Sequence, residues 1–418
     1  MSPIDGLRYG GLGFALAFVA LPLYVTLPAY YAENFGTPLA ALGLVLLLAR
    51  GIDALADPLI GRLADRWLDG PAAPLLRRLA LAAVVLAFSF ALLFFPVPRA
   101  GTPLLIWCTV LLVCTYLAYS VLTVLHQAWG ARLGGDALRQ TRLNAWREGL
   151  ALAGVLTASV LPALAGMGVT AAALALGLLT GLWLLRRAPR AELVTGQQAA
   201  LSVAWQTPGF RRLLAVFLLN GTAAAIPATL LLFFVRDRLQ TPAAEPLFLA
   251  SYFLAAAASL PLWLRLVARL GAARSWALGM ALAIAAFAWA ALLGPGDWLG
   301  FLFVCLGSGF ALGADLALPG AMLTRVIQQA GLAGRAEGAF FGWWNGANKL
   351  NLALAAGLAL PLLQALGYTP GQRDATGLQA LTLAYCLLPC LLKAAAAGLL
   401  YLLWIRPERK ALPCLQHP

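Results

Sequence analysis

The sequence predicts an all-α membrane protein with twelve transmembrane helices, arranged as two six-helix bundles. Of its 418 residues, 62% are hydrophobic and only 11% are charged, and the mean hydropathy is +0.85. The charges gather between long apolar segments. Because a helix needs about 20 apolar residues to cross a bilayer, this pattern indicates a chain that crosses the membrane repeatedly. It excludes a soluble protein.

Apolar segments of membrane-spanning length follow one another along the whole chain. Those of the first half lie near 9–33, 38–65, 77–97, 102–131, 141–165 and 168–186. Those of the second half lie near 213–235, 245–270, 275–294, 298–325, 337–366 and 376–405. We therefore predict an N-terminal bundle at 1–186, a cytoplasmic linker at 187–212, a C-terminal bundle at 213–405 and a cytoplasmic tail at 406–418.

The formal net charge of +13 reflects arginines that fall mostly in alternate loops. This asymmetry is the positive-inside pattern, and it places both termini in the cytoplasm. A nucleic-acid partner would require a basic face on a soluble domain, so the distribution argues against one. The cysteines lie mostly within apolar segments and lack metal-ligand spacing, so we expect them to be buried thiols. We expect the first apolar run to be a membrane span rather than a cleaved signal peptide.

A weak internal repeat relates the two halves. Residues 57–63, DPLIGRL, align with residues 260–266, LPLWLRL, so that a proline, an arginine and two leucines match. The same register places Arg50, Asp53 and Asp57 opposite apolar residues of the second half. The fold elements therefore repeat while the charges do not, which indicates that these charges serve function. Two sets of six helices joined by a basic loop resemble the major facilitator fold.

The second apolar segment carries the charge cluster Arg50, Asp53 and Asp57. Spacings of three and four residues place these side chains on one helix face. A charge in hydrocarbon costs several kcal/mol, so the cluster should face a partner or an aqueous cavity. With a rise of about 1.5 Å per residue, Asp53 lies roughly 18 Å above Asp65, near the midplane. We predict that Asp53 and Asp57 bind a cation or proton; permanent salt bridges that stabilise the bundle are the alternative.

Further charged residues within the predicted spans complete an expected coupling network with Arg50. Arg147 and Glu148 lie about 10 Å into the fifth span, and Lys349 lies about 20 Å into the eleventh. Asp315, in the tenth span, could pair with Lys349. Lys393 lies midway along the last span, and its sequence context suggests no role.

Four polar residues are candidates for lining a substrate cavity. Tyr119 and His126 belong to the fourth predicted span, and Asn345 and Asn348 share a face of the eleventh with Lys349. His126 could relay protons, since histidine titrates near physiological pH, or it could simply donate a hydrogen bond between helices.

The polar run Gly61-Arg62-Leu63-Ala64-Asp65-Arg66 ends the second predicted span. We expect Gly61, Asp65 and Arg66 to form a conformational latch, in which Asp65 caps a neighbouring helix and pairs with cytoplasmic arginines. A solvated turn is the alternative.

These residues resemble the glycoside–pentoside–hexuronide:cation symporter family. Arg50-Gly-Ile-Asp53-Ala-Leu-Ala-Asp57-Pro58 fits the family motif Arg-x-x-Asp-Ala-x-x-Asp-Pro at every position. The resemblance continues in three further segments: 139–147 (RQTRLNAWR), 335–338 followed by Lys349, and Gly367-Tyr368-x-Pro370. It implies that both acids belong to a site for Na⁺, Li⁺ or H⁺.

The sequence departs from the sugar-transporting members of that family at three positions. Ala17 and Leu122 stand where those members carry sugar-binding aspartates, and His126 stands where they carry a tryptophan. The residues of the cation side are therefore retained, whereas those of the substrate side differ.

We expect a secondary transporter of a bacterial cytoplasmic membrane that couples a small organic solute to Na⁺ or H⁺ by alternating access. Its expected partners are this solute and membrane lipids, with no nucleic acid and no cofactor, and the protein is expected to be a monomer. An exporter or lysolipid transporter on the same fold is the first alternative. An integral-membrane enzyme is the second, but no loop has the Asp, Glu, His and Cys content that a catalytic centre requires.

Overall fold

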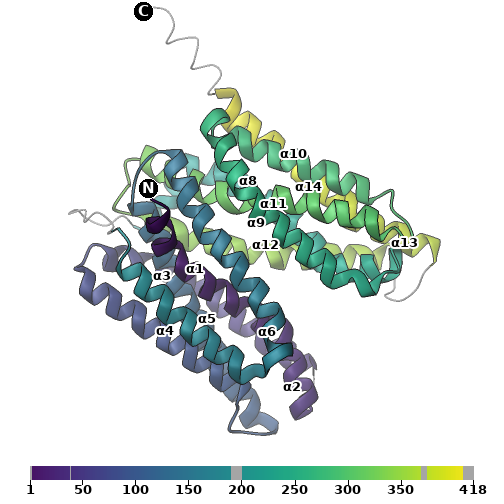
Figure 1. Ribbon diagram of the computed structural model, residues 1–418, viewed down its shortest axis with the longest axis horizontal. Coiled ribbons are helices and arrows are strands. Elements are labelled where there is room, and N and C mark those ends of the chain that lie inside the picture. Colours follow the sequence, from purple (N-terminus) through teal and green to yellow (C-terminus); the bar gives the residue numbers. More distant parts are fainter. Residues whose placement is uncertain (1, 38, 190–199, 369–373, 408–418) are drawn as a thin grey trace, which may run out of the picture. The chain divides into compact units, whose positions relative to one another are not determined.

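The computed structural model describes all residues except 1, 38, 190–199, 369–373 and 408–418 (Figure 1). The described residues form helices joined by short connections, with no strand among them. This agrees with the all-α prediction. It also follows from the bilayer environment, in which an α-helix satisfies its backbone hydrogen bonds within a single segment.

The first half of the chain contains the helices of the predicted N-terminal bundle. In order they are α1 (Pro3–Leu21), the π-helical segment η1 (Pro22–Thr26), α2 (Leu27–Phe35), α3 (Leu39–Leu68), α4 (Ala72–Phe94), α5 (Gly101–Arg132) and α6 (Ala137–Arg186). A short helix, α7 (Val203–Gln206), precedes the second half.

The second half continues the same pattern. Its elements are α8 (Pro208–Phe233), η2 (Phe234–Arg238), η3 (Pro242–Ala244), α9 (Glu245–Leu270), α10 (Ala272–Ala290), α11 (Trp298–Gln329), α12 (Glu337–Ala365), α13 (Ala375–Thr382), η4 (Leu383–Leu387), α14 (Leu388–Leu400) and η5 (Tyr401–Ile405).

The predicted apolar segments fall on these elements to within a few residues. The segments at 141–165 and 168–186 both lie in α6, which is interrupted between them at Gly166. Gly166 has φ 77° and ψ 171°, a conformation that glycine adopts without the steric cost of a Cβ. The break therefore divides α6 into two lengths, each suited to one crossing.

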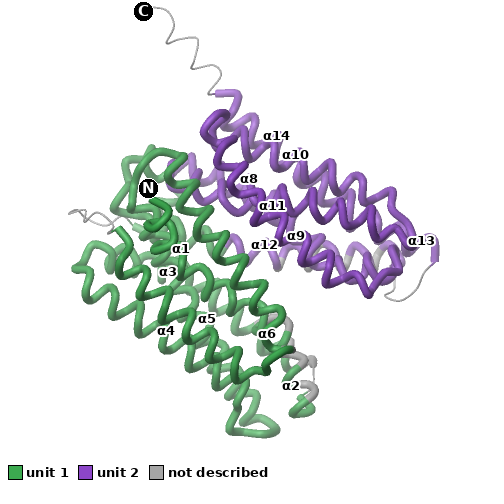
Figure 2. The backbone as a smooth tube through the Cα atoms, in the orientation of Figure 1, with its two compact units in different colours: residues 1–206, 327–346 green, residues 207–326, 347–418 purple. Residues whose placement is uncertain are grey.

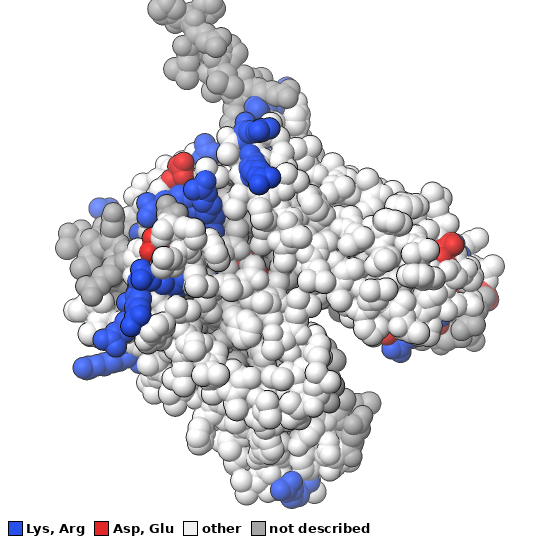
Figure 3. All heavy atoms as spheres, viewed as in Figure 1, with Lys and Arg blue, Asp and Glu red and all other residues white. Residues whose placement is uncertain are grey.

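Nine helices among the described residues are long and apolar enough to cross a membrane. The count of twelve spans and the cytoplasmic location of both termini remain predictions, and most of the predicted tail lies outside the described residues. On the visible face of unit 1, Lys and Arg gather mainly at one end and leave the sides uncharged (Figure 3). Large apolar side chains are exposed along the helices, such as Phe88 at 67% and Leu391 at 68%, as expected for surfaces in contact with lipid.

The chain forms two compact units (Figure 2). Unit 1 comprises residues 1–206 and 327–346, and unit 2 comprises residues 207–326 and 347–418. The segment 327–346, which includes the first ten residues of α12, is grouped with unit 1 although it belongs to the second half of the chain. The reason lies in the contacts of the α12 N-terminus, described below.

Close packing of α1 on α6 holds unit 1 together. Four glycines on these helices, Gly10, Gly13, Gly154 and Gly181, remove the side chains that would separate the two backbones. A Cβ on Gly154 would lie 2.1 Å from the Phe14 carbonyl oxygen. Small residues at helix contacts allow this approach in membranes, where packing replaces the hydrophobic effect between helices. Unit 2 has a separate aromatic core around Phe234, which stacks on Tyr385 at 4.2 Å between ring centroids.

Substitution of Gly154 by alanine should destabilise the protein, because the new methyl group would collide with the α1 backbone. Overpacking of this kind costs about 1–3 kcal/mol. The matched control is Gly398→Ala in α14, where an added Cβ meets nothing within 4 Å and the higher helix propensity of alanine favours folding. Thermal denaturation in detergent should show a lower Tm for Gly154→Ala only; equal Tm values would contradict the packing.

Candidate functional site

Two buried carboxylates on α3 form the centre of the candidate site. Asp53 is 1% exposed and Asp57 is 0% exposed. The Ser120 hydroxyl on α5 donates a hydrogen bond of 2.6 Å to Asp53 Oδ1. The guanidinium of Arg50 lies over the Tyr116 ring at 4.5 Å from its centroid. The α3 face that carries the charges therefore packs against a face of α5 that presents a hydroxyl and an aromatic ring.

The same cluster extends toward α6. Tyr119 of α5 lies within electrostatic range of Arg50, Asp53 and Glu148. Glu148 accepts two hydrogen bonds from its neighbour Arg147, at 2.6 Å from Nη2 and 3.0 Å from Nε. Unit 1 thus brings the first-half members of the predicted charge network together on three helices, α3, α5 and α6.

Buried carboxylates in this setting favour a positively charged ligand. Taking an ionised carboxylate out of water costs several kcal/mol unless charge or hydrogen bonds compensate. Oxygen ligands from two carboxylates and a hydroxyl match the preference of hard cations for oxygen, and a carboxylate can alternatively take up a proton. The oxygen ligands of this cluster are of the kind that suits Na⁺ or H⁺, and among the described residues no cluster of His, Cys, Asp and Glu forms a transition-metal ligand set.

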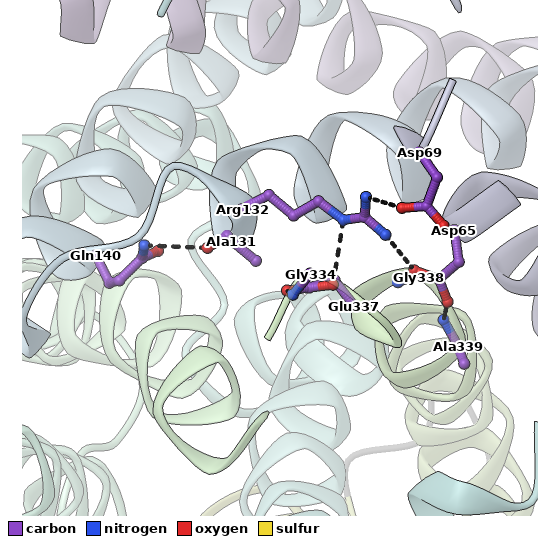
Figure 4. Close-up of polar contacts among 9 residues, drawn as sticks. All are labelled: Asp65, Asp69, Ala131, Arg132, Gln140, Gly334, Glu337, Gly338 and Ala339. Atoms are coloured by element: carbon purple, nitrogen blue, oxygen red, sulfur yellow. Dashed lines mark hydrogen bonds and ion pairs between the residues drawn. The ribbon is translucent and has the colours of Figure 1, made fainter. Parts of the chain in front are cut away.

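A second cluster lies two to three turns further along α3, where α3 and α5 meet the N-terminus of α12 (Figure 4). Asp65 Oδ1 accepts a hydrogen bond of 2.7 Å from the Gly338 amide, and Oδ2 accepts one of 2.8 Å from the Ala339 amide. These are unsatisfied amides of a helix N-terminus, where the helix dipole also favours negative charge. Asp65 therefore caps α12, as the sequence predicted for a neighbouring helix.

Arg132, at the end of α5, joins three acids of this second cluster. Its guanidinium contacts Asp69 at 2.6 Å, Glu337 at 3.2 Å and Asp65 at 3.4 Å. The side chain of Arg132 is only 1% exposed. The predicted arginine, Arg66, is exposed instead, since as the next residue of the helix it points about 100° away from Asp65. We call Asp65, Asp69, Arg132 and Glu337 the α12 latch.

Three glycines allow α3 and α12 to meet backbone to backbone beside this latch. A Cβ on Gly61 would lie 2.1 Å from the Gly338 carbonyl oxygen, and one on Gly338 would lie 2.2 Å from that of Gly61. One turn further, a Cβ on Gly342 would lie 2.6 Å from the Asp57 carbonyl oxygen. The contact between the two helices therefore runs from the latch to the buried acid Asp57.

The predicted substrate-cavity residues occupy different surroundings. His126 is 1% exposed, and its Nε2 makes a 2.7 Å hydrogen bond with the Tyr9 carbonyl oxygen, which joins α5 to α1. Asn345 donates a hydrogen bond of 2.9 Å to Gln127 on α5. Asn348 is exposed in unit 2, and Lys349 is partly buried there. Tyr119, His126 and Asn345 therefore belong to unit 1, whereas Asn348 belongs to unit 2.

Asp315 has a different cationic partner from the one suggested by the sequence. Lys393 of α14 contacts it at 2.9 Å, within unit 2. The sequence could not distinguish Lys349 from Lys393, because both lie deep in apolar segments and only the helix packing decides which of them faces α11.

Sequence reasoning missed several residues of both clusters. Ser120 and Tyr116 lie four residues apart in α5, a spacing that could have indicated a polar face opposite Asp53. Glu337 begins α12, where an acidic residue is favoured by the helix dipole. Arg132 resembles any loop arginine in the sequence, and only its burial shows its role. Of the motif Gly367-Tyr368-x-Pro370, Pro370 lies outside the described residues.

Replacing Arg132 by glutamine should destabilise the protein, since three carboxylates would then face one another without their cation. Loss of one partner from a buried ion pair costs about 3–5 kcal/mol. The matched control is Arg66→Gln, an exposed arginine in the same region, for which a change within about 0.5 kcal/mol is expected. Thermal denaturation in detergent measures both; similar Tm values for the two variants would show that the α12 latch contributes no stability.

Two curated relatives match parts of the chain. The inner membrane symporter YicJ of Escherichia coli is 31% identical over 137 residues, which are 32% of this chain and 28% of the relative. The putative glycoside/cation symporter YagG of Escherichia coli is 28% identical over 157 residues, which are 37% of this chain and 34% of the relative. The chain thus matches about a third of the length of each.

Solved transporter structures share the fold over nearly the whole chain. A bacterial homologue of the iron transporter ferroportin, in an outward-facing state, aligns with a TM-score of 0.68 and 18% identity, covering 95% of this chain and 100% of the other. The Escherichia coli fucose:proton symporter FucP aligns with a TM-score of 0.65 and 13% identity, covering 94% of this chain and 98% of the other. At these identities the likeness concerns the fold.

The family model described as "MFS/sugar transport protein" matches residues 7–406. This family match, together with the two curated relatives, confirms the resemblance to cation symporters that the α3 motif indicated. It indicates a transporter rather than an enzyme. The apolar helices and their exposed apolar surfaces agree with a multi-pass location in the membrane. The chain belongs to the MFS/sugar transport protein family.

Proposed function

We propose that this protein is a cation-coupled symporter in which Asp53 and Asp57 bind the coupling ion, Na⁺ or H⁺. The observation that carries the proposal is the complete burial of two carboxylates, on one face of an apolar helix and beside the hydroxyl of Ser120. The second half carries Ala256 and Leu260 at the corresponding positions. The fold alone therefore does not require these acids.

The coupling step uses the contact between α3 and α12. An ion that binds to Asp57 neutralises a charge directly beside the backbone on which Gly342 packs. Asp65, two turns further along α3, binds the amides at the start of α12. A change in the ion pairs around Asp57 can therefore affect the α12 latch through two turns of α3 and through its contact with α12. Arg147, Glu148 and Lys349 are proposed as further partners whose pairings shift when the ion binds.

The proposed substrate is a small organic solute, carried by alternating access across a bacterial inner membrane. The curated relatives are a symporter of the inner membrane and a putative glycoside/cation symporter, which favours a glycoside-like solute. Ala17 and Leu122 provide no carboxylate to bind sugar hydroxyls, and Leu122 is fully buried. Recognition of the solute therefore depends on other residues, among which Tyr119, Asn345 and Asn348 remain candidates.

Asp57→Asn and Asp53→Asn should each abolish ion-driven accumulation, because an amide carries no negative charge to bind Na⁺ and cannot exchange a proton at neutral pH. Uptake is measured in proteoliposomes with radiolabelled methyl glycosides of glucose, galactose and xylose, under an inward Na⁺ or H⁺ gradient. We expect a loss of at least about tenfold, corresponding to about 1.4 kcal/mol.

The matched control is Asp136→Asn, which removes an exposed charge but keeps an effective N-cap for α6. Its ion-driven uptake should equal that of the wild type. Wild-type uptake that is independent of both gradients, or undiminished accumulation in the two α3 variants, would contradict coupling through these acids.

A further inference from the structure

Unit 2 contains a cavity of about 150 Å³ that the proposed cation site does not use. Its walls are mostly apolar, and they include aromatic rings from three helices and η4. These rings belong to Phe248 of α9, Phe287 of α10, Phe301 of α11 and Tyr385 of η4. A cavity of this size lined by apolar side chains can hold a molecule as large as benzene. The aromatic walls also favour a planar ring, which can pack on them edge to face or offset.

One end of this cavity is polar, because Asp315 and Lys393 both line it. Lys393 Nζ donates to Asp315 Oδ2 at 2.9 Å and to Asn220 Oδ1 at 2.8 Å. Asp315 Oδ1 accepts two more hydrogen bonds, from Asn220 Nδ2 at 2.9 Å and from Trp276 Nε1 at 2.8 Å. Four helices, α8, α10, α11 and α14, therefore fix this ion pair in place.

Hydrogen-bonding capacity remains at this polar end. An ammonium group has three donors, and Lys393 uses two of them on its described partners. A carboxylate has about four acceptor sites, and Asp315 uses three. One donor and one acceptor are left within the same ion pair, and a single hydroxyl group can satisfy both.

We propose that this cavity is a binding site for a compact, uncharged aromatic alcohol of the phenol type. Its ring fills the apolar end, and its hydroxyl accepts from Lys393 and donates to Asp315. The inference goes beyond the proposed function, because it concerns unit 2 only and would stand if Asp53 and Asp57 bound no ion.

The charges and dimensions of the cavity restrict the class of ligand. Asp315 and Lys393 are its only charged lining residues within the described part of the chain, and they neutralise each other. A charged ligand would therefore enter an apolar site without a compensating charge, at a large desolvation cost. A sugar would bury several hydroxyls against largely apolar walls, where the ion pair and the hydroxyls of Tyr252, Ser308 and Tyr385 are the main polar groups. An uncharged, apolar molecule with a single hydroxyl avoids both the buried charge and the surplus of buried hydroxyls.

Equilibrium dialysis of the purified full chain in nanodiscs, with radiolabelled phenol and toluene, tests this proposal. The two probes have nearly the same shape and differ in the hydroxyl. The variant Ala228→Phe, in identical nanodiscs, provides the correction for partition into lipid, because Ala228 lines the cavity and a phenyl group there fills it. After this correction we expect one phenol bound per chain, with a Kd at least about tenfold below that of toluene, as for one net hydrogen bond.

The double variant Asp315→Leu/Lys393→Met tests the role of the ion pair. It replaces both charges by apolar groups of similar size, a change that buried pairs commonly tolerate. It should bind toluene at least as tightly as phenol. Three results would overturn the proposal: equal or tighter binding of toluene by the wild type, equal binding of phenol by Ala228→Phe and the wild type, or an unchanged preference for phenol in the double variant.

Discussion

The need to pair buried charges with partners governs the structure of unit 1. Helix α3 carries two fully buried acids, Asp53 and Asp57, and a third, Asp65, that is 2% exposed. Asp53 accepts a hydrogen bond from Ser120, whereas Asp65 contacts Arg132 and the amides of α12. In an apolar bundle these partners determine which helices lie against α3. The position of α5 and of the α12 N-terminus follows from the charges as much as from apolar packing.

The grouping of residues 327–346 with unit 1 follows from the same constraint. The first turn of α12 offers amides and a positive dipole end, and α3 offers a carboxylate at that point. Gly61, Gly338 and Gly342 then let the backbones meet, so a polar cap and a close helix contact support each other. The remainder of α12, from Ala347 onward, is grouped with unit 2.

Hydropathy predicted the helices and most of their boundaries, because bilayer thickness sets the length of every apolar segment. Helix periodicity predicted that Asp53 and Asp57 share a face, and the family motif assigned them a cation site. Arg132 and Lys393 escaped these arguments for a common reason: their roles depend on which helices are neighbours. A charge in an apolar segment indicates that a partner exists, but its sequence context does not identify that partner. The cavity beside Asp315 was unpredictable for the same reason, since residues of six elements line it.

We propose that ion binding at the acids of α3 alters the α12 latch. Hydrogen exchange at the amides of Gly338 and Ala339, measured by mass spectrometry on the reconstituted protein, tests it directly. We expect saturating Na⁺, or low pH if the ion is H⁺, to change the protection of these two amides in the wild type and to leave it unchanged in Asp57→Asn. Protection that does not respond to either ion in the wild type, or that responds equally in the variant, would contradict it.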